Sequence, residues 1–339
     1  MEDQEALPIP FDFSSGSERL HLICERDVGL FSLIQQVIAN IPWALQENRV
    51  PVAYFQARTC YWTPNGYQNR DTVWEYYFEP IVVAHPASSI PQHIRSIVSL
   101  NPPSAFEVGY FADQNTFVSA HFGDHPDLKD KALFIPYLLD DPRDELRQEA
   151  SVVIRHFVRP RVYIQEKVDR FFRDHMNGHY VIGVHIRGTD AASEEEIRPH
   201  RYGSPQLPKY VEQTERLLKT EPDAMIFVAT DAQASVDFIK KMFGSRVITY
   251  DSIRHQKGNT AEKGPTGWIM PSYITHDRDQ AARNGEEAVI EYLLLARCNY
   301  LIHNGSGLTR TVLLKVPEMP HVNTHGGQRI GYEANKGAL

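Results

Sequence analysis

Apolar residues in the first part of the chain form short continuous runs separated by a stretch of helical periodicity. Residues 20–24 make one apolar run, and apolar side chains then recur every three or four positions between 33 and 41. A second apolar run covers 50–55. This order predicts a strand, a helix and a second strand, a βαβ unit whose two strands lie parallel in one sheet.

The second half of the chain repeats this alternation. Residues 180–186 are almost continuously apolar, which is typical of a strand buried on both faces. Further strands are predicted over 224–229, 246–250 and 300–303, and helices over 208–218, 232–243, 286–296 and from 308 onward. A helical pattern over 143–175, broken at Pro160, precedes this series. The second half is therefore expected to form a second parallel sheet.

Two α/β units of this kind define the expected fold class. We expect two Rossmann-like domains facing a central cleft, an N-terminal acceptor-side domain over 19–165 and a C-terminal donor-side domain over 166–339. Residues 1–18 are acidic and rich in Pro and Ser, which predicts a flexible lead-in. Residues 86–130 show no clear periodicity. In open parallel sheets ligands bind at the carboxyl ends of the strands, so polar residues there are the functional candidates.

The composition is that of a folded protein, with 42% hydrophobic and 23% charged residues. The net charge of −8 argues against broad nucleic-acid binding, because phosphate backbones bind basic surfaces. Three widely spaced cysteines give no sign of a disulfide framework and favour a reducing compartment. No apolar run is long enough to cross a bilayer, and the N-terminus lacks the features of a signal peptide. We therefore expect a cytoplasmic protein without an integral membrane segment, or a secretory-lumen protein if a leader has been trimmed.

The strand predicted over 180–186 ends in a concentration of polar residues. His185, Arg187 and Asp190 occur within six positions, and the first two share one face of the strand because they are two residues apart. A buried arginine needs an anionic partner, and its planar guanidinium matches a phosphate group in two-point contact. Arg187 is therefore either part of a diphosphate site or the partner of Asp190 in an ion pair that holds the loop.

The strand predicted over 300–303 is followed by a turn of small residues, Asn-Gly-Ser-Gly, and then by a helix. Glycines let a phosphate approach the backbone, and the N–H groups at a helix start bind anions. Ser306 and Gly307 are the candidate ligands in this turn. The alternative is a plain tight turn in which Ser306 only caps the helix.

Carboxylates supply further candidates in the second half. Glu287 and Glu291 share one face of their predicted helix, where they are either solvated or turned inward, one of them then accepting hydrogen bonds from a guanine edge. Asp231 ends a strand, where capping of the next helix is favoured over contact with a nucleotide. Glu195 lies in a run of three glutamates that is ordinarily solvated, although one of them could serve as a general base.

Gly29 and Phe31 are the candidates in the first half. A glycine between a strand and a helix permits close approach of a ligand, although a simple turn gives the same pattern. The aromatic segment 61–78 is a candidate platform for an acceptor. No metal site is expected, because two pairs of histidines four residues apart lack a third ligand at metal-binding spacing.

The motif from His185 to Asp190 resembles the His-x-Arg-x-Thr-Asp signature of the α1,6-fucosyltransferase or NodZ-like family, within the fucosyltransferase superfamily. Similar family features are the glycine loop at Gly29, the Trp74 segment ending in Phe78-Glu-Pro80, Ala-Thr-Asp231, Glu291 and Ser306. These features span about residues 22–80 and 180–310, and their order and spacing carry the resemblance.

The resemblance implies a GT-B-like, inverting, metal-independent glycosyltransferase that uses GDP-fucose as its donor and has no cofactor. Arg187 would hold the β-phosphate together with Ser306, and Glu195 matches the family's proposed catalytic base, with Asp190 as the other choice. The donor-binding residues would be Gly29, Phe31, His185, Arg187, Asp231, Glu291, Ser306 and Gly307.

Two positions depart from the family pattern. Gly188 stands where the family often has a second arginine, and Ala191 stands where it has a lysine. They keep two alternatives open: a transferase that uses another nucleotide sugar, and a degenerate module that binds a nucleotide or glycan without catalysis. The expected partners are a GDP-sugar donor and a carbohydrate or protein hydroxyl acceptor, with no nucleic acid.

Overall fold

The computed structural model describes residues 19–135, 141–187, 207–255 and 277–324. The first βαβ unit is confirmed: β1 (Leu20–Cys24), α1 (Leu30–Gln46) and β2 (Val50–Tyr54), with the two strands parallel. Two further strands complete this sheet in the order β2-β1-β4-β3: β4 (Thr116–Ser119), parallel to β1, and the antiparallel edge strand β3 (Tyr110–Phe111). Both lie in the stretch 86–130 that showed no clear periodicity, and neither was predicted.

The second sheet is wholly parallel, with the order β7-β6-β5-β8-β9. Its strands are β5 (Val181–Ile186), β6 (Met225–Thr230), β7 (Val247–Ile248), β8 (Tyr300–His303) and β9 (His321–Asn323). The first four were predicted and β9 was not. Successive strands run outward from β5 on one side and from β8 on the other, so β5 and β8 flank the topological switch point. Ligands of parallel sheets bind at such a point.

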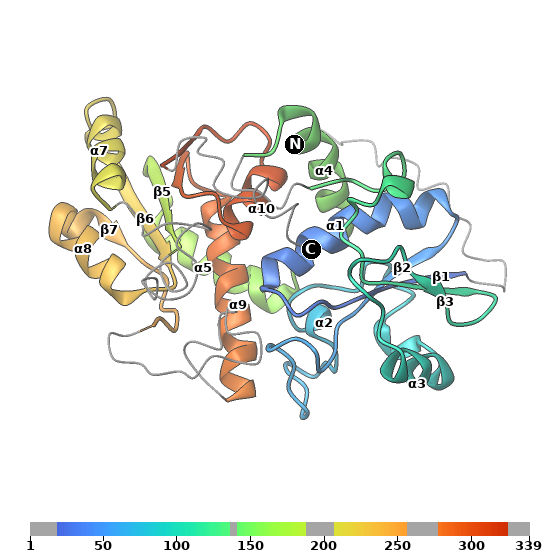
Figure 1. The fold of residues 1–339 in the computed structure, drawn as a ribbon. Coiled ribbons are helices and arrows are strands. Elements are labelled where there is room, and N and C mark those ends of the chain that lie inside the picture. Colours follow the sequence, from blue (N-terminus) through green and yellow to red (C-terminus); the bar gives the residue numbers. More distant parts are fainter. Residues whose placement is uncertain (1–18, 136–140, 188–206, 256–276, 325–339) are drawn as a thin grey trace, which may run out of the picture.

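Helices cover both faces of the second sheet and fill the space between the two sheets (Figure 1). The outer helices are α7 (Leu207–Leu218) and α8 (Gln233–Phe243) on the second sheet and α3 (Gln92–Leu100) on the first. The inner helices are α1, α4 (Asp144–Phe157), α5 (Val162–His175), α9 (Arg278–Leu295) and α10 (Gly307–Lys315). The break between α4 and α5 contains Pro160, as predicted. Apolar side chains of the inner helices form one cluster that reaches both sheets.

The aromatic segment 61–78 lies partly in this shared core, where its rings cannot form an acceptor platform; that prediction remains for Trp62 and Tyr67, which are partly exposed. It contains the short helix α2 (Val73–Tyr77), and the rings of Trp74, Tyr77 and Phe78 are at most 2% exposed. The hydroxyl of Tyr77 donates to the carbonyl oxygen of Ala282 in α9 at 2.7 Å. Burying large rings removes much apolar surface from water, which is why the segment packs between the halves.

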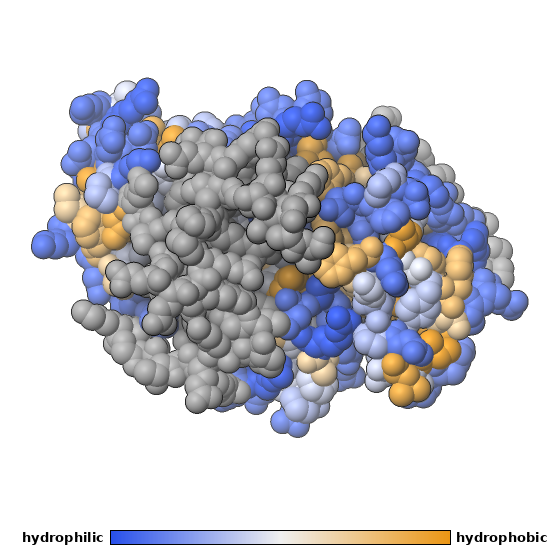
Figure 2. Space-filling model, viewed as in Figure 1, coloured by the Kyte–Doolittle hydropathy of each residue, from blue (hydrophilic) through white to orange (hydrophobic). Residues whose placement is uncertain are grey.

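The described part of the surface in Figure 2 is mainly hydrophilic, with apolar patches towards the end of the molecule where α3 and β3 lie. The large exposed apolar side chains of that region are Leu100, Phe106 and Phe111. Among the described residues, no helix is both long and apolar enough to cross a membrane.

Candidate active site

Arg187 directly follows β5, and its guanidinium faces the carboxylate of Asp231, which directly follows β6. The Nε of Arg187 lies 3.5 Å from Oδ2 of Asp231. The Arg187 side chain is 28% exposed, so a ligand can reach it. Asp231 was expected to cap the following helix, and this is wrong. The N-cap residue of α8 is Ala232, which makes no side-chain cap, and the carboxylate of Asp231 faces Arg187 instead.

The buried side chain of Asn304 holds the backbone of Arg187. Its Nδ2 donates to the carbonyl oxygen of Arg187, and its Oδ1 accepts the N–H of Arg187, both at 3.4 Å. These contacts extend the link between β5 and β8 beyond their last paired residues, Val184 and Ile302. This role of Asn304 was not predicted, because nothing in the local sequence shows which backbone groups an amide side chain will contact.

Ser306 lies at the switch point, at the start of α10. Its Oγ accepts the N–H of Thr309 at 3.3 Å, so Ser306 caps the helix, and the same atom lies 3.4 Å from Nδ1 of His185; its contact with a phosphate stays a prediction. Gly305 has a φ of 75°, a conformation that strongly favours glycine. α10 begins at Gly307, directly after Ser306. Because Ser306 contacts His185 in β5, the first N–H groups of α10 lie beside the end of β5, where they can bind an anion.

Glu287 and Glu291 are both buried, so the solvated interpretation is wrong and both carboxylates are turned inward; the contact with a guanine edge stays a prediction. Oε1 of Glu291 accepts hydrogen bonds from Oγ of Ser252 at 2.7 Å and from Nη2 of Arg254 at 3.4 Å. Burial raises the pKa of Glu291 to about 7, against the opposing effect of the Arg254 guanidinium. Glu287 accepts the N–H of Ile253 at 2.8 Å. The two carboxylates thus hold the segment that follows β7.

The first half of the chain reaches the same region through the start of α1. Gly29 has an ordinary φ of −61°, and a Cβ there would meet nothing within 4 Å, so there is open space beside it. Phe31 is 8% exposed and packs edge-on against Tyr292, with ring centroids 5.5 Å apart. Gln35 donates to the carbonyl oxygen of Gly307 at 2.7 Å, which joins α1 to α10.

Asp190 and Glu195, the two candidates for a catalytic base, lie outside the described residues, as do Gly188 and Ala191. Of the donor-binding candidates, His185, Arg187, Asp231 and Ser306 meet around the carboxyl ends of β5, β6 and β8. Gly307 follows Ser306, and Glu291 lies within electrostatic range of Asp231. The region combines a reachable guanidinium with a helix start, an arrangement that can bind a diphosphate.

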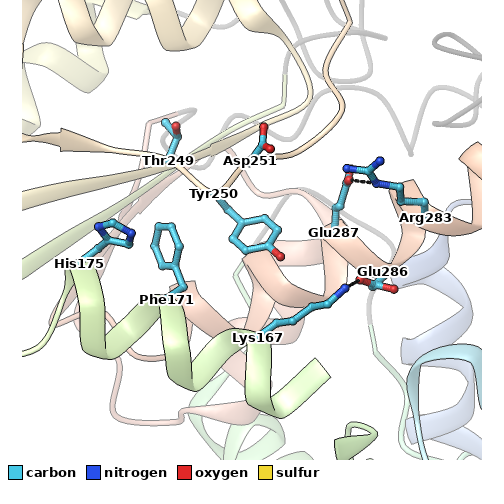
Figure 3. Close-up of a pocket in the computed structure, with 9 residues that line it drawn as sticks. All are labelled: Lys167, Phe171, His175, Thr249, Tyr250, Asp251, Arg283, Glu286 and Glu287. Atoms are coloured by element: carbon cyan, nitrogen blue, oxygen red, sulfur yellow. Dashed lines mark hydrogen bonds and ion pairs between the residues drawn. The ribbon is translucent and has the colours of Figure 1, made fainter. Parts of the chain in front are cut away.

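A hollow of about 380 Å³ lies between α5, α9 and the end of β7 (Figure 3). Two ion pairs lie within it, Arg283 with Glu287 at 2.9 Å and Lys167 with Glu286. Tyr67 also donates to Glu286, at 2.7 Å. Of the predicted candidates, Glu287 lines this hollow, whereas Arg187, Asp231 and Ser306 do not. Because Glu286 and Glu287 already have cationic partners, we assign the hollow no ligand.

Two buried histidines predict a loss of stability in mild acid. Burial lowers the pKa of His21 and of His185 to about 3, and the positive charges of Arg49 and Arg187 add to the effect. Between about pH 6.5 and pH 3 the unfolded chain therefore binds more protons than the folded chain. The free energy of unfolding should fall by about 1.4 kcal/mol per pH unit for each histidine.

Urea unfolding measured between pH 7.5 and pH 4.5 checks this expectation. His21→Phe should lower the slope of unfolding free energy against pH by one histidine's contribution, because phenylalanine does not titrate. Phenylalanine is chosen because the His21 ring packs edge-on against Trp43 and Phe117. His93→Gln is the control, since that side chain is 64% exposed. An unfolding free energy that stays constant from pH 7 to pH 5 would contradict the assignment.

The two sheets and their inner helices define the protein's class: its fold is that of GT-B-like fucosyltransferases. The structure of NodZ α-1,6-fucosyltransferase soaked with GDP-fucose matches 88% of this chain and 93% of its own, with a TM-score of 0.51 and 16% identity. POFUT1 in complex with GDP matches 93% of this chain and 99% of its own, with a TM-score of 0.54 and 13% identity.

The sequence resembles the same group. Nodulation protein Z of Sinorhizobium fredii is 24% identical over 190 residues, which cover 54% of this chain and 54% of that protein. Nodulation protein Z of Bradyrhizobium diazoefficiens is 27% identical over 202 residues, or 57% and 50% of the two chains. The chain thus spans about half the length of these relatives, and no family model matches it. The predicted resemblance and fold class are confirmed.

Proposed function

We propose that the protein is an inverting, metal-independent glycosyltransferase that transfers fucose from GDP-fucose to a hydroxyl group of a carbohydrate or protein. The observation that carries the proposal is the meeting of Arg187, Ser306 and the start of α10 at the switch point of the second sheet. Solved structures with the same fold hold GDP-fucose and GDP, which supports a guanine nucleotide as the ligand.

In the proposed reaction, the acceptor oxygen attacks the anomeric carbon of fucose on the face opposite the diphosphate. The bond from that carbon to the diphosphate oxygen breaks, and GDP leaves with the electron pair. The acceptor proton passes to a carboxylate, Glu195 or Asp190. Arg187 and the N-terminal dipole of α10 stabilise the charge that grows on the departing diphosphate, which is the task that a metal ion would otherwise perform.

The site offers the diphosphate neutral donors as well as a cation. The low pKa of His185, about 3, keeps its ring uncharged at neutral pH, and Ser306 contributes a hydroxyl. Gln35 joins α1 to Gly307, and Gly29 at the start of α1 has open space beside it, which supports a donor bound between the halves. The domain limits of 19–165 and 166–339 belong to the same proposal.

GDP release from GDP-fucose, measured in the presence of EDTA and a panel of sugar and peptide hydroxyl acceptors, tests the proposal. Turnover with GDP-fucose that exceeds turnover with GDP-mannose or UDP-glucose supports it. Preference for another donor would move the assignment to a different nucleotide sugar. Gly188 and Ala191 favour the degenerate module as the second candidate, and tight GDP binding without turnover on any acceptor would establish it.

The proposed contact between Glu291 and the guanine edge predicts a pH dependence of binding. A carboxylate accepts the guanine N–H groups best when it is ionised, and the pKa of Glu291 is about 7. GDP affinity should therefore fall about tenfold between pH 8 and pH 6. In Glu291→Gln the affinity should be lower and nearly independent of pH, since an amide does not titrate. Calorimetric titrations at both pH values measure this, and an equal slope in the two proteins would refute the contact.

A further inference from the structure

Three polar side chains from distant parts of the chain meet beside the turn that contains Ser306. Asp141 precedes α4, His303 ends β8 and His321 begins β9. The carboxylate of Asp141 lies 3.5 Å from Nε2 of His303 and 3.3 Å from Nε2 of His321. The potential ligand atoms all lie within 4.8 Å of one another. Two histidines and a carboxylate at this spacing fit either a divalent metal ion or a charged hydrogen-bonding network.

The far side of the His303 ring favours the network. Its Nδ1 accepts the backbone N–H of Gly305 at 3.0 Å, so this nitrogen offers its lone pair. The neutral ring must then carry its proton on Nε2, the atom that faces Asp141. A metal ion would need the lone pair of that same Nε2. His303 therefore presents an N–H group, and not a metal ligand, to the carboxylate.

The His321 ring is oriented in the opposite way. Its Nδ1 lies 3.0 Å from the carbonyl oxygen of Met319, which can only accept, so Nδ1 carries a proton. Contact with Asp141 raises the pKa of His321, which favours a second proton on Nε2. Asn323 donates to Oδ1 of Asp141 at 3.3 Å. Among the described residues, the groups that face the carboxylate are therefore donors; His321 and Asn323 are in hydrogen-bond range, and the Nε2–H of His303, at 3.5 Å, makes an electrostatic contact.

We infer that Asp141 is a positioning residue for the turn before α10: it holds His303 as the Nε2-protonated tautomer, so that Nδ1 fixes the N–H of Gly305. This inference rests on the proposed function, because the turn places Ser306 and the start of α10 for the diphosphate. Gly305 is in the left-handed region at a φ of 75°, and the bond to His303 stabilises that conformation.

Contacts at the other end of α10 support this role. Arg147, in α4, donates to the carbonyl oxygen of Leu313 in the last turn of α10, at 3.4 Å, and to that of Met319, which follows α10, at 3.2 Å. The short stretch from Asp141 to Arg147 thus contacts both ends of α10, directly at its C-terminus and through His303 at its N-terminus. We expect the stretch from Asp141 to Arg147 to affect the N-terminus of α10 only through the His303 ring.

A double-mutant cycle in the full chain tests that route, with the GDP dissociation constant as the readout. Asp141→Asn should weaken GDP binding about tenfold, because the tautomer is no longer fixed. In His303→Asn the new side-chain oxygen can accept the N–H two residues on, as asparagine does in turns. In that background Asp141→Asn should cost less than about twofold. An equal loss in both backgrounds would overturn the inference, and Asp223→Asn, an exposed aspartate before β6, is the control for charge.

Two further measurements keep the inference testable if GDP does not bind, and the first needs only the unmutated chain, so it also serves if a variant does not fold. Nitrogen-15 spectra of the imidazole rings should show His303 as the neutral form protonated on Nε2, and a form protonated on Nδ1 would overturn the inference. Calorimetric titration with Zn²⁺ alone should show no binding that depends on Asp141. Stoichiometric Zn²⁺ binding that Asp141→Asn abolishes would identify a metal site and also overturn it. Absence of GDP binding with the expected tautomer would refute only the proposed function.

Discussion

Replacing Arg187 with alanine should weaken binding of GDP and GDP-fucose by roughly 100-fold, or about 3 kcal/mol, and depress turnover at least as much. The guanidinium is the reachable cation at the switch point, and it would make two-point contact with the phosphates. Its loss also leaves the carboxylate of Asp231, which is 12% exposed, to repel the diphosphate. Calorimetric titration and GDP release measure the two effects separately.

Two variants control for this change. Arg187→Lys keeps the charge but lacks the planar fork, so it should recover only part of the affinity. Arg216→Ala removes an exposed arginine from α7, in the same half of the chain, and should leave binding unchanged. Near-native GDP binding by Arg187→Ala, with an unchanged melting temperature, would show that the phosphate assignment is wrong.

Gly285→Ala should destabilise the protein by about 1–3 kcal/mol, because a methyl group there overpacks the contact between α9 and the aromatic segment. The new Cβ would lie 2.3 Å from the hydroxyl oxygen of Tyr77 and 3.0 Å from Cδ1 of Tyr61. The hydroxyl cannot move away without losing its hydrogen bond to Ala282. Urea unfolding measures the loss of stability.

The matched control for Gly285→Ala is Gly29→Ala. Gly29 has an ordinary φ and open space around its Cα, so alanine meets no clash there and should cost at most about 1 kcal/mol, the loss expected at a helix N-cap. Tyr77→Phe removes the closest atom, and adding it to Gly285→Ala should therefore restore part of the lost stability. If Gly285→Ala were as stable as the native protein, or the two changes were strictly additive, the packing between the halves would differ from that described.

Much of the fold could be predicted from hydrophobic patterning. The strands of the second sheet except β9 followed from the apolar runs, and so did the helices between them, although α9 begins at Arg278 and not at the predicted 286. The strands β3 and β4 did not follow, because prolines and polar turns surround them, whereas the equally short β7 and β8 each follow a helix that was predicted. The burial of Trp74, Tyr77 and Phe78 could not be predicted for another reason: part of the surface that covers these rings comes from α9, about 200 positions away.

The residues of the candidate site likewise fall into some that the sequence predicts and others that it does not. Arg187 and Ser306 end adjacent strands, and the switch-point rule alone brings them together. Asp231 was assigned to a cap because a strand end before a helix ordinarily needs one, whereas its partner lies on the neighbouring strand. Asn304 and Asp141 act through atoms that only the folded chain brings near, so no local signal marks them.

Calorimetric titration of the full chain with GDP-fucose in the presence of EDTA tests the central claim most directly. We expect saturable binding of GDP-fucose and GDP, with much weaker binding of UDP, and we expect EDTA to have no effect. Binding of UDP in preference to GDP would contradict the guanine assignment, and absence of binding by every nucleotide tested would contradict the transferase itself.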